Sequence, residues 1–424
     1  MKMSHLKSLI LAIVVGFLLP LPVKAADDLT DLLIKKGTIT KEEADSLQKR
    51  EIVPFIDKIT LYGDIRLREE TMWYPGNSNN SKDLNRQRFR LRIGADIQEG
   101  KTFVHFRVAS GSGQQVSTNQ TMQSNSSGKA IFIDKAYVEL KQIPDLNVLG
   151  GKMTNPFFIN WPTGEIVFDD DLNPEGFAQQ YALKLGDNQK VFVNLGQIIL
   201  DGGQSSDAGS KNGQWLLGEQ IGTEMKMDQI GFNVAALLYT LANGQQTNFN
   251  SAVFQDGNTR RACNTTPASS NCLANPFSVV DLTAALKFNA GLPILISFDG
   301  IKNLQDTVQK TSPSIKNQDT GFGAAIKLGN ASAANTYEVA YEYRAIEADA
   351  TLADLNDSDF GPNGGTNRKG HTLWAAYNFT SATQVKLKYF NTKMIKKDLA
   401  TTAVPGSNPN PSFNRIQLDF SVKF

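Results

Sequence analysis

The strongest constraint on the fold is a strict alternation of charged and apolar residues. In the run RQRFRLRI, residues 86–93, every second position is an arginine, and Phe89, Leu91 and Ile93 stand between them. On a helix, at about 100° per residue, the four arginines would be scattered around the cylinder. On a strand they share one face and the apolar residues share the other. The run therefore predicts a β-strand with one charged and one apolar face.

The same period of two continues through the chain. Near the beginning Leu61, Ile65 and Leu67 alternate with charged residues, and the last ten residues, 415–424, alternate through to Phe424. A soluble β-sandwich also alternates, with its apolar face turned inward. Here the polar face carries rows of charge, which favours a different class of all-β protein.

The connections between candidate strands separate the two classes. We count about sixteen strands, with 14 or 18 as alternatives, and short and long connections alternate strictly. A transmembrane barrel has short turns on one rim, long loops on the other and an even number of strands. The predicted short connections are 98–101, 142–145, 186–189, 228–229, 289–293, 329–335 and 380–382; the long ones are 71–85, 109–130, 153–176, 200–213, 241–277, 303–317, 347–368 and 394–413.

Burial in lipid decides which face points inward. Every backbone polar group of a membrane-spanning sheet must be paired, so the sheet has to close. An arginine facing lipid at mid-bilayer costs roughly 2–4 kcal/mol, so the basic faces must line the interior. About sixteen strands leave an aqueous channel. The predicted pore-lining basic residues are Arg66, Arg68, Arg86, Arg88, Arg90 and Arg92.

The N-terminal region differs from the rest. Residues 1–25 combine a basic start, an apolar run from Leu9 to Leu19 and small residues before Ala25, which predicts a cleaved signal peptide. A membrane anchor is the alternative, but the run is short for a bilayer core of roughly 30 Å. Residues 26–52 have helical spacing and a capping box at Thr40 and Glu43, which predicts a short periplasmic helical segment before a barrel over 53–424.

Three runs resemble the “putative porin” family of Gram-negative outer membranes: LLIKKGTITKEEADSL, GGKMTNPFFINWPTGEIVFDDDLNPEGFA, and YEYRAIEADATLADLNDSDFGPNGGTNRKGH. The resemblance covers essentially the whole chain after residue 25. It implies an outer-membrane porin for passive diffusion of small hydrophilic solutes and ions, with no cofactor. It also implies outer-membrane lipid and the barrel-assembly machinery as partners, with Phe424 as the C-terminal assembly signal, and a homotrimer is one possible assembly.

The third long loop, 153–176, is rich in carboxylates. Resemblance to general diffusion porins implies that it folds into the barrel and faces the arginines; the alternative is a solvated rim. Oxygen-bearing residues also stand at every second position from Asp169 onward, which allows an alternative interpretation as a loose calcium site. Pro174 stands where an EF-hand needs glycine, so this is not an EF-hand, and no metal is predicted. The predicted acidic residues of the constriction are Glu165, Asp169, Asp170, Asp171 and Glu175.

Two cysteines, Cys263 and Cys272, lie close together in a long loop, and in an oxidising compartment they predict a disulfide. No CxxC spacing or neighbouring histidine supports zinc.

Only His105 and His371 follow the signal peptide, and no hydrolase or phosphate-loop motif occurs, so no catalytic residues are predicted. A formal net charge of +1 gives no general attraction to nucleic acid. The remaining alternatives are a solute-specific channel, for anions or oligopeptides, and a non-conducting structural or adhesive barrel.

Overall fold

A computed structural model of the chain describes residues 35–36, 40, 56–75, 83–160, 162–201, 213–243, 257–261, 272–305, 317–362, 364–396 and 412–424. The chain divides into two units, Met1–Ile56 and Asp57–Phe424. The predicted signal peptide and, apart from residues 35–36 and 40, the predicted helical segment lie outside the described residues. Within the described part of the chain, no helix is long and apolar enough to cross a membrane.

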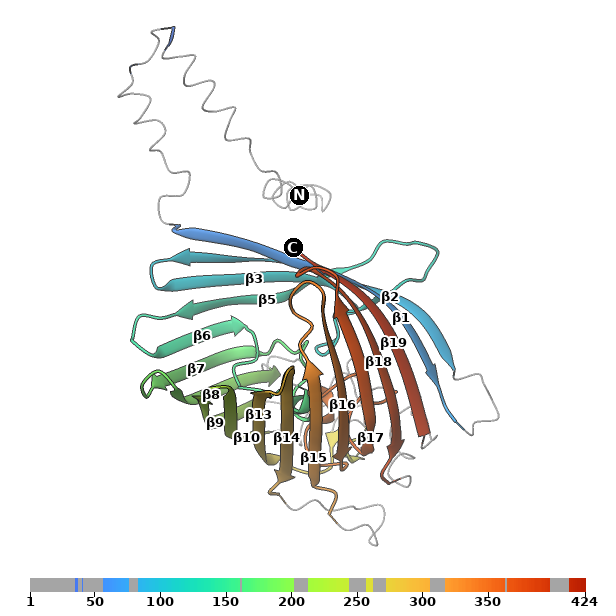
Figure 1. Cartoon of the computed structure of the whole chain (residues 1–424). Coiled ribbons are helices and arrows are strands. Elements are labelled where there is room, and N and C mark those ends of the chain that lie inside the picture. The colour runs from blue at the N-terminus through green and yellow to red at the C-terminus, as the bar shows by residue number, and fades with distance from the viewer. Residues whose placement is uncertain are drawn as a thin grey trace, which may run out of the picture. The chain divides into compact units, whose positions relative to one another are not determined.

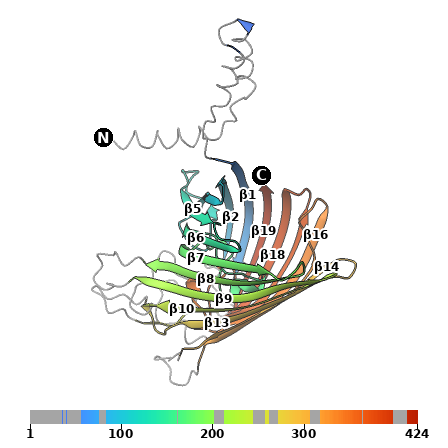
Figure 2. The ribbon, with the colours of Figure 1, turned by 90° about the vertical axis from the view of Figure 1, so that its left-hand side faces the viewer.

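The second unit is a closed antiparallel β-barrel, as predicted (Figures 1 and 2). Its sheet contains 17 strands, of which the two-residue β4 (Gln120–Thr121) is a short addition to β2, and the other sixteen form the wall. These are β1 (Lys58–Trp73), β2 (Leu84–Glu99), β3 (Thr102–Ser110), β5 (Ile131–Leu140), β6 (Leu146–Lys152), β7 (Glu175–Lys184), β8 (Gln189–Asp201), β9 (Gln214–Met227), β10 (Ile230–Ala242), β13 (Ser278–Asn289), β14 (Pro293–Asn303), β15 (Thr320–Gly329), β16 (Thr336–Ile346), β17 (Arg368–Asn378), β18 (Thr383–Met394) and β19 (Ser412–Lys423).

The barrel closes where the last strand pairs with the first. Strand β1 lies between β2 and β19, with Leu67 opposite Phe420 in the register. The seam continues to the last residue, since the backbone of Phe424 exchanges two hydrogen bonds with Gly63, at 2.8 and 3.0 Å. A Cβ on Gly63 would lie 2.6 Å from the Phe424 ring and 2.7 Å from the backbone oxygen of Arg92, so a larger residue would push the strands apart at this crossing. The alternation of short turns and long loops matches the predicted order, with boundaries shifted by a few residues.

The two faces of the wall are reversed relative to a soluble protein. On β19 the outward side chains Ile416, Leu418 and Phe420 are 38%, 48% and 43% exposed, whereas the inward Arg415 and Gln417 are buried. The same pattern holds on β1, where Leu61, Ile65 and Leu67 are exposed. An apolar outer band and a polar interior are what a bilayer requires of a barrel.

Several long loops fold into the interior and build an apolar core there. Phe157 and Phe168 of the β6–β7 loop and Leu355 of the β16–β17 loop pack against Leu237 and Tyr239, which point inward from β10. Two 3-10 helices, η2 (Thr163–Ile166) and η4 (Ala353–Leu355), belong to these loops. Beside them the strands β11 (Arg260–Arg261) and β12 (Cys272–Leu273) form a small hairpin. The core therefore occupies the β8–β14 side of the lumen, opposite the basic strands.

Candidate functional site

The six predicted arginines point into the barrel from β1 and β2. Their partners lie on neighbouring strands and on loops inside the lumen: Arg66 donates to Asn119 Oδ1 at 2.6 Å, and Arg88 contacts Ser117. The alternation of the two strands places them in one patch, because Arg66 lies opposite Arg90 and Arg68 opposite Arg88 in the register.

Most of these arginines are neutralised by carboxylates of the wall. Arg68 donates two hydrogen bonds to the Asp419 carboxylate, at 2.7 and 2.8 Å. Asp64 accepts from both Arg90 and Arg92, at 3.0 and 2.7 Å. A bidentate arginine–carboxylate pair fixes both side chains in direction. Ion pairs with wall carboxylates therefore fix the positions of the arginines on the basic face of the barrel.

Side chains of the wall hold the β6–β7 loop, residues 153–174, inside the barrel. Gln220 on β9 bonds the backbone N–H and C=O of Phe158, at 2.7 and 2.8 Å, as a neighbouring strand would. Asn160 donates to Thr283 on β13 at 2.8 Å. These bonds place η2 against β14, β15 and β16.

Four of the five predicted acidic residues lie together on this loop. Glu165 pairs with Arg344 of β16 at 2.9 Å, and Asp171 with Arg92 at 3.2 Å. Asp169 accepts hydrogen bonds from the backbone N–H groups of Asp171 and Ser358, whereas Asp170 is exposed.

The fifth acidic residue, Glu175, does not belong to the group. It begins β7 on the side of the outward Phe177, has a side chain that is 63% exposed, and pairs with Lys152. The sequence grouping differs here because the loop ends at Pro174, one residue before Glu175, so strand periodicity sets the direction of that side chain.

The pKa values of the loop carboxyls diverge. Burial, with Asp357 and Asp170 nearby, raises the pKa of Glu165 to about 8 despite Arg344 and Lys388. Burial and the adjacent Asp170 and Asp171 raise the pKa of Asp169 well above its ordinary value.

Asp171 behaves in the opposite way. Its burial opposes ionisation, but Arg90 and Arg92 outweigh it and lower its pKa. The negative charge of the loop is therefore concentrated on Asp171, beside Arg90 and Arg92.

The three consecutive aspartates, Asp169 to Asp171, are the one group of metal-binding type found in the described part of the chain, with ligand atoms within 4.8 Å of one another. Two of them already have partners: backbone N–H groups on Asp169 and Arg92 on Asp171. Backbone N–H groups and Arg92 therefore already occupy some of the oxygen atoms of this group.

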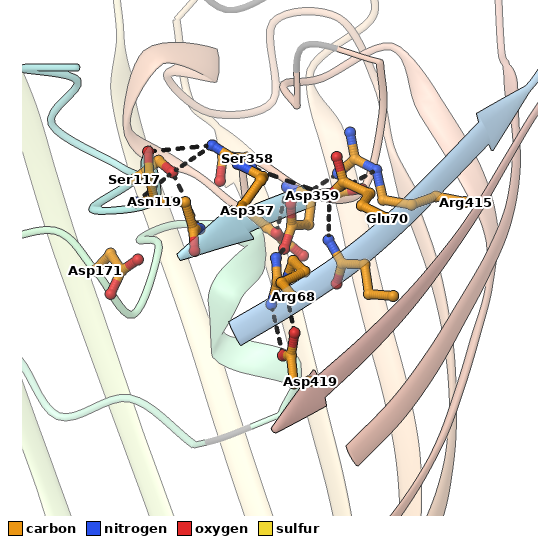
Figure 3. A network of polar contacts seen from close by, with 12 residues as sticks. Arg68, Glu70, Ser117, Asn119, Asp171, Asp357, Ser358, Asp359, Arg415 and Asp419 are labelled. Atoms are coloured by element: carbon orange, nitrogen blue, oxygen red, sulfur yellow. Dashed lines mark hydrogen bonds and ion pairs between the residues drawn. The ribbon is translucent and has the colours of Figure 1, made fainter. Parts of the chain in front are cut away.

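A second inward loop, residues 347–367 between β16 and β17, carries carboxylates of the site that the sequence pattern did not predict. Asp359 pairs with Arg68 at 3.1 Å and with Arg415 of β19 at 2.8 Å (Figure 3). Asp357 pairs with Arg344 at 2.7 Å. Both carboxylates stand in the run from Tyr341 to His371 that carries the family resemblance, but alternation could not mark them because they lie outside the strands.

A third inward loop, residues 111–130 between β3 and β5, meets the second one. Ser358 Oγ donates to the carbonyl of Val116 at 2.9 Å, and Gln115 donates to the carbonyl of Asp354 at 2.7 Å. Figure 3 places Ser117 and Asn119 beside Ser358, with Arg68 between Asp359 and Asp419.

Two cavities lie on either side of this meeting point. A cavity of about 250 Å³ is lined by residues at the long-loop ends of the strands, including Arg86 and Gln123. Another, of about 300 Å³, reaches the short-turn end at Lys423. They share Asn119, Ser358 and Asp359, which therefore stand at a narrow point between the two cavities.

The other predicted residues are placed as follows. Phe424 completes the seam with β1. Cys263 lies outside the described residues, so its pairing with Cys272 stays a prediction. His105 is bonded between Asp96 and Glu139, at 2.8 and 3.2 Å, whereas His371 is on the outer face beside Tyr341.

An apolar outer band, a charged interior and long loops folded into the barrel are the features of a membrane channel of the porin class. The chain belongs to the family described as “Putative porin”, whose model matches residues 75–424. No curated protein matches the sequence.

Two solved structures are similar to this chain. OprB of Pseudomonas putida is 11% identical, with a TM-score of 0.52 over 86% of this chain and 94% of OprB. OmpF of Salmonella typhi is also 11% identical, with a TM-score of 0.49 over 87% of this chain and 98% of OmpF. At this identity OprB supports the barrel fold alone.

Proposed function

We propose that this porin lets small hydrophilic solutes and ions diffuse passively across the bacterial outer membrane, and that opposed charges at one level of the lumen set its selectivity. The observation that carries the proposal is the composition of the cavity of about 300 Å³. It is lined by Arg66, Arg68 and Arg90 of the barrel wall and by Asp169, Asp170 and Asp171 of the β6–β7 loop.

The physical consequence is a field across the path of the solute. Fixed charges of opposite sign on facing walls orient dipolar solutes, and low-dielectric surroundings keep them less screened than charges at the rim. Since the whole chain is nearly neutral, with a formal net charge of +1, ion preference must come from these local groups.

Measuring ion selectivity tests the proposal directly. In planar bilayers with a KCl gradient, D169N/D170N/D171N should shift the zero-current potential towards anions, and R88Q/R90Q/R92Q should shift it towards cations. Both shifts should shrink between about 0.1 M and 1 M salt, as the Debye length falls from about 10 Å to 3 Å.

Single substitutions provide a matched control. D170N removes one carboxylate that lines the cavity, and E175Q removes one from the outer face of β7, directly after the same loop. D170N should move the zero-current potential and E175Q should not. Equal effects would place the selectivity elsewhere, and absence of any conductance would favour a structural or adhesive barrel.

Export and assembly complete the proposal. Residues 1–25 would direct export and be removed, and the long loops would face the cell exterior with the short turns in the periplasm. The terminal aromatic residue Phe424 would be read by the barrel-assembly machinery. Assembly into a homotrimer also belongs to the proposal, because the apolar outer band can meet lipid or another copy.

A further inference from the structure

The cavity on the long-loop side of the narrow point has an unusual charge balance. Three arginines line it, Arg86, Arg88 and Arg415, together with neutral polar residues such as Gln114 and Gln120. Its lining includes one carboxylate, Asp359.

That carboxylate is already engaged. Asp359 accepts from Arg68 at 3.1 Å and from Arg415 at 2.8 Å. The next nearest acid, Glu70, is bonded by Arg86 at 2.5 Å and by Gln417 at 2.8 Å. Two of the three cavity arginines therefore have close carboxylate partners.

Arg88 is the exception. It lies 4.0 Å from Glu70, beyond hydrogen-bond distance, and its other contacts are long ones, 3.5 Å to Ser117 Oγ and 3.4 Å to the carbonyl of Asn119. Its Nε has no hydrogen-bond partner among the described residues, a property it shares with Arg415, but Arg415 has a carboxylate at 2.8 Å and Arg88 has none so near. By contrast, Arg68 at the same level of the barrel is bonded to two carboxylates.

A buried guanidinium with unused donors favours an anionic partner. A carboxylate matches its planar fork and forms charge-assisted hydrogen bonds, while neutral amides and hydroxyls nearby can bond to other polar groups of a ligand. The cavity volume of about 250 Å³ equals that of roughly eight water molecules at about 30 Å³ each, which admits a solute of a few carbon atoms.

We propose that this cavity is a binding subsite for a small organic monocarboxylate on its way to the narrow point, with Arg88 as the residue that recognises the carboxylate. Among the described residues, Arg88 is the one arginine of this cavity without a carboxylate within hydrogen-bond distance, so a single negative charge completes the site, which favours a monocarboxylate over a multiply charged anion. The inference rests on the proposed function and specifies a solute class for it.

The test compares lactate with glycerol, which has the same number of heavy atoms and no charge. Single-channel currents of the mature protein are recorded in KCl with each solute added on either side. Lactate should reduce the open-channel current in a saturable way, more effectively from the long-loop side, and glycerol should not saturate. R88Q should raise the half-blocking concentration of lactate about tenfold, equivalent to about 1.4 kcal/mol.

Two further variants separate recognition from net charge and from folding. R88K keeps the charge without the fork, so lactate block should lie between that of the parent and R88Q. R107Q makes the same charge change at an arginine that is paired with Asp134 and does not line the cavity. It should leave the half-blocking concentration unchanged.

The outcomes distinguish this inference from the proposed function. If the channel conducts but lactate does not block it, the subsite is overturned while the porin function stands. The same holds if R107Q and R88Q raise the half-blocking concentration of lactate equally. A channel that glycerol blocks in the same saturable way overturns recognition of the carboxylate. Absence of conductance in the parent overturns the proposed function and the subsite together.

Discussion

Replacing Arg344 tests how the inward loops are held in the lumen. This residue on β16 is fully buried, and its guanidinium bonds Glu342 at 2.5 Å, Asp357 at 2.7 Å and Glu165 at 2.9 Å. Asp357 and Glu165 belong to different loops, so one side chain ties both loops to the barrel wall.

The magnitude follows from the burial of these groups. Removing one partner of a buried ion pair leaves uncompensated charge and costs about 3–5 kcal/mol. R344M has a side chain of comparable length without charge, so Glu342, Asp357 and Glu165 lose their shared hydrogen-bond donor and Asp357 loses its cation. We expect the free energy of unfolding to fall by about 3–5 kcal/mol, and the single-channel conductance to rise because the loops are released.

Urea unfolding in lipid vesicles, followed by tryptophan fluorescence, measures the first effect, and planar bilayers measure the second. R344K is the matched control, since it keeps the charge and loses the fork, and it should lose less stability than R344M. If R344M unfolds within about 0.5 kcal/mol of the parent and conducts equally, Arg344 does not anchor the loops.

Two further predictions follow from the loops. Because the pKa of Glu165 is about 8 in the folded state, above its ordinary value, this group's contribution to stability should fall as pH rises from about 4.5 to 8. Its ionisation should move the zero-current potential towards cations between pH 7 and 9. This pH-dependent shift should be smaller in E165Q than in the parent. For the predicted Cys263–Cys272 disulfide, mass spectrometry should find no free thiols, and reduction should leave conductance unchanged while removing about 2–3 kcal/mol of loop-closure stabilisation; free thiols would contradict it.

Local pattern was sufficient for the barrel itself. The period of two, the alternation of short and long connections, and the cost of arginine in lipid predicted a closed antiparallel barrel of about sixteen strands with its charges inside. Each of these signals is read from residues close together in the chain, such as Arg88 and Arg90. The sequence also identified the loop with the acidic run, since carboxylates concentrated in one connection are visible without a structure.

The interior of the barrel was decided only by the tertiary structure. Glu165 meets Arg344 across 179 residues of sequence, and Arg68 meets Asp419 across 351. The loops that narrow the path have no periodicity, so no local pattern shows which of them turn inward or where they touch. Their positions depend on apolar contacts and buried ion pairs that exist only once the barrel has closed around them. The sequence therefore determined the wall of this porin, and the folded structure decided what the wall encloses.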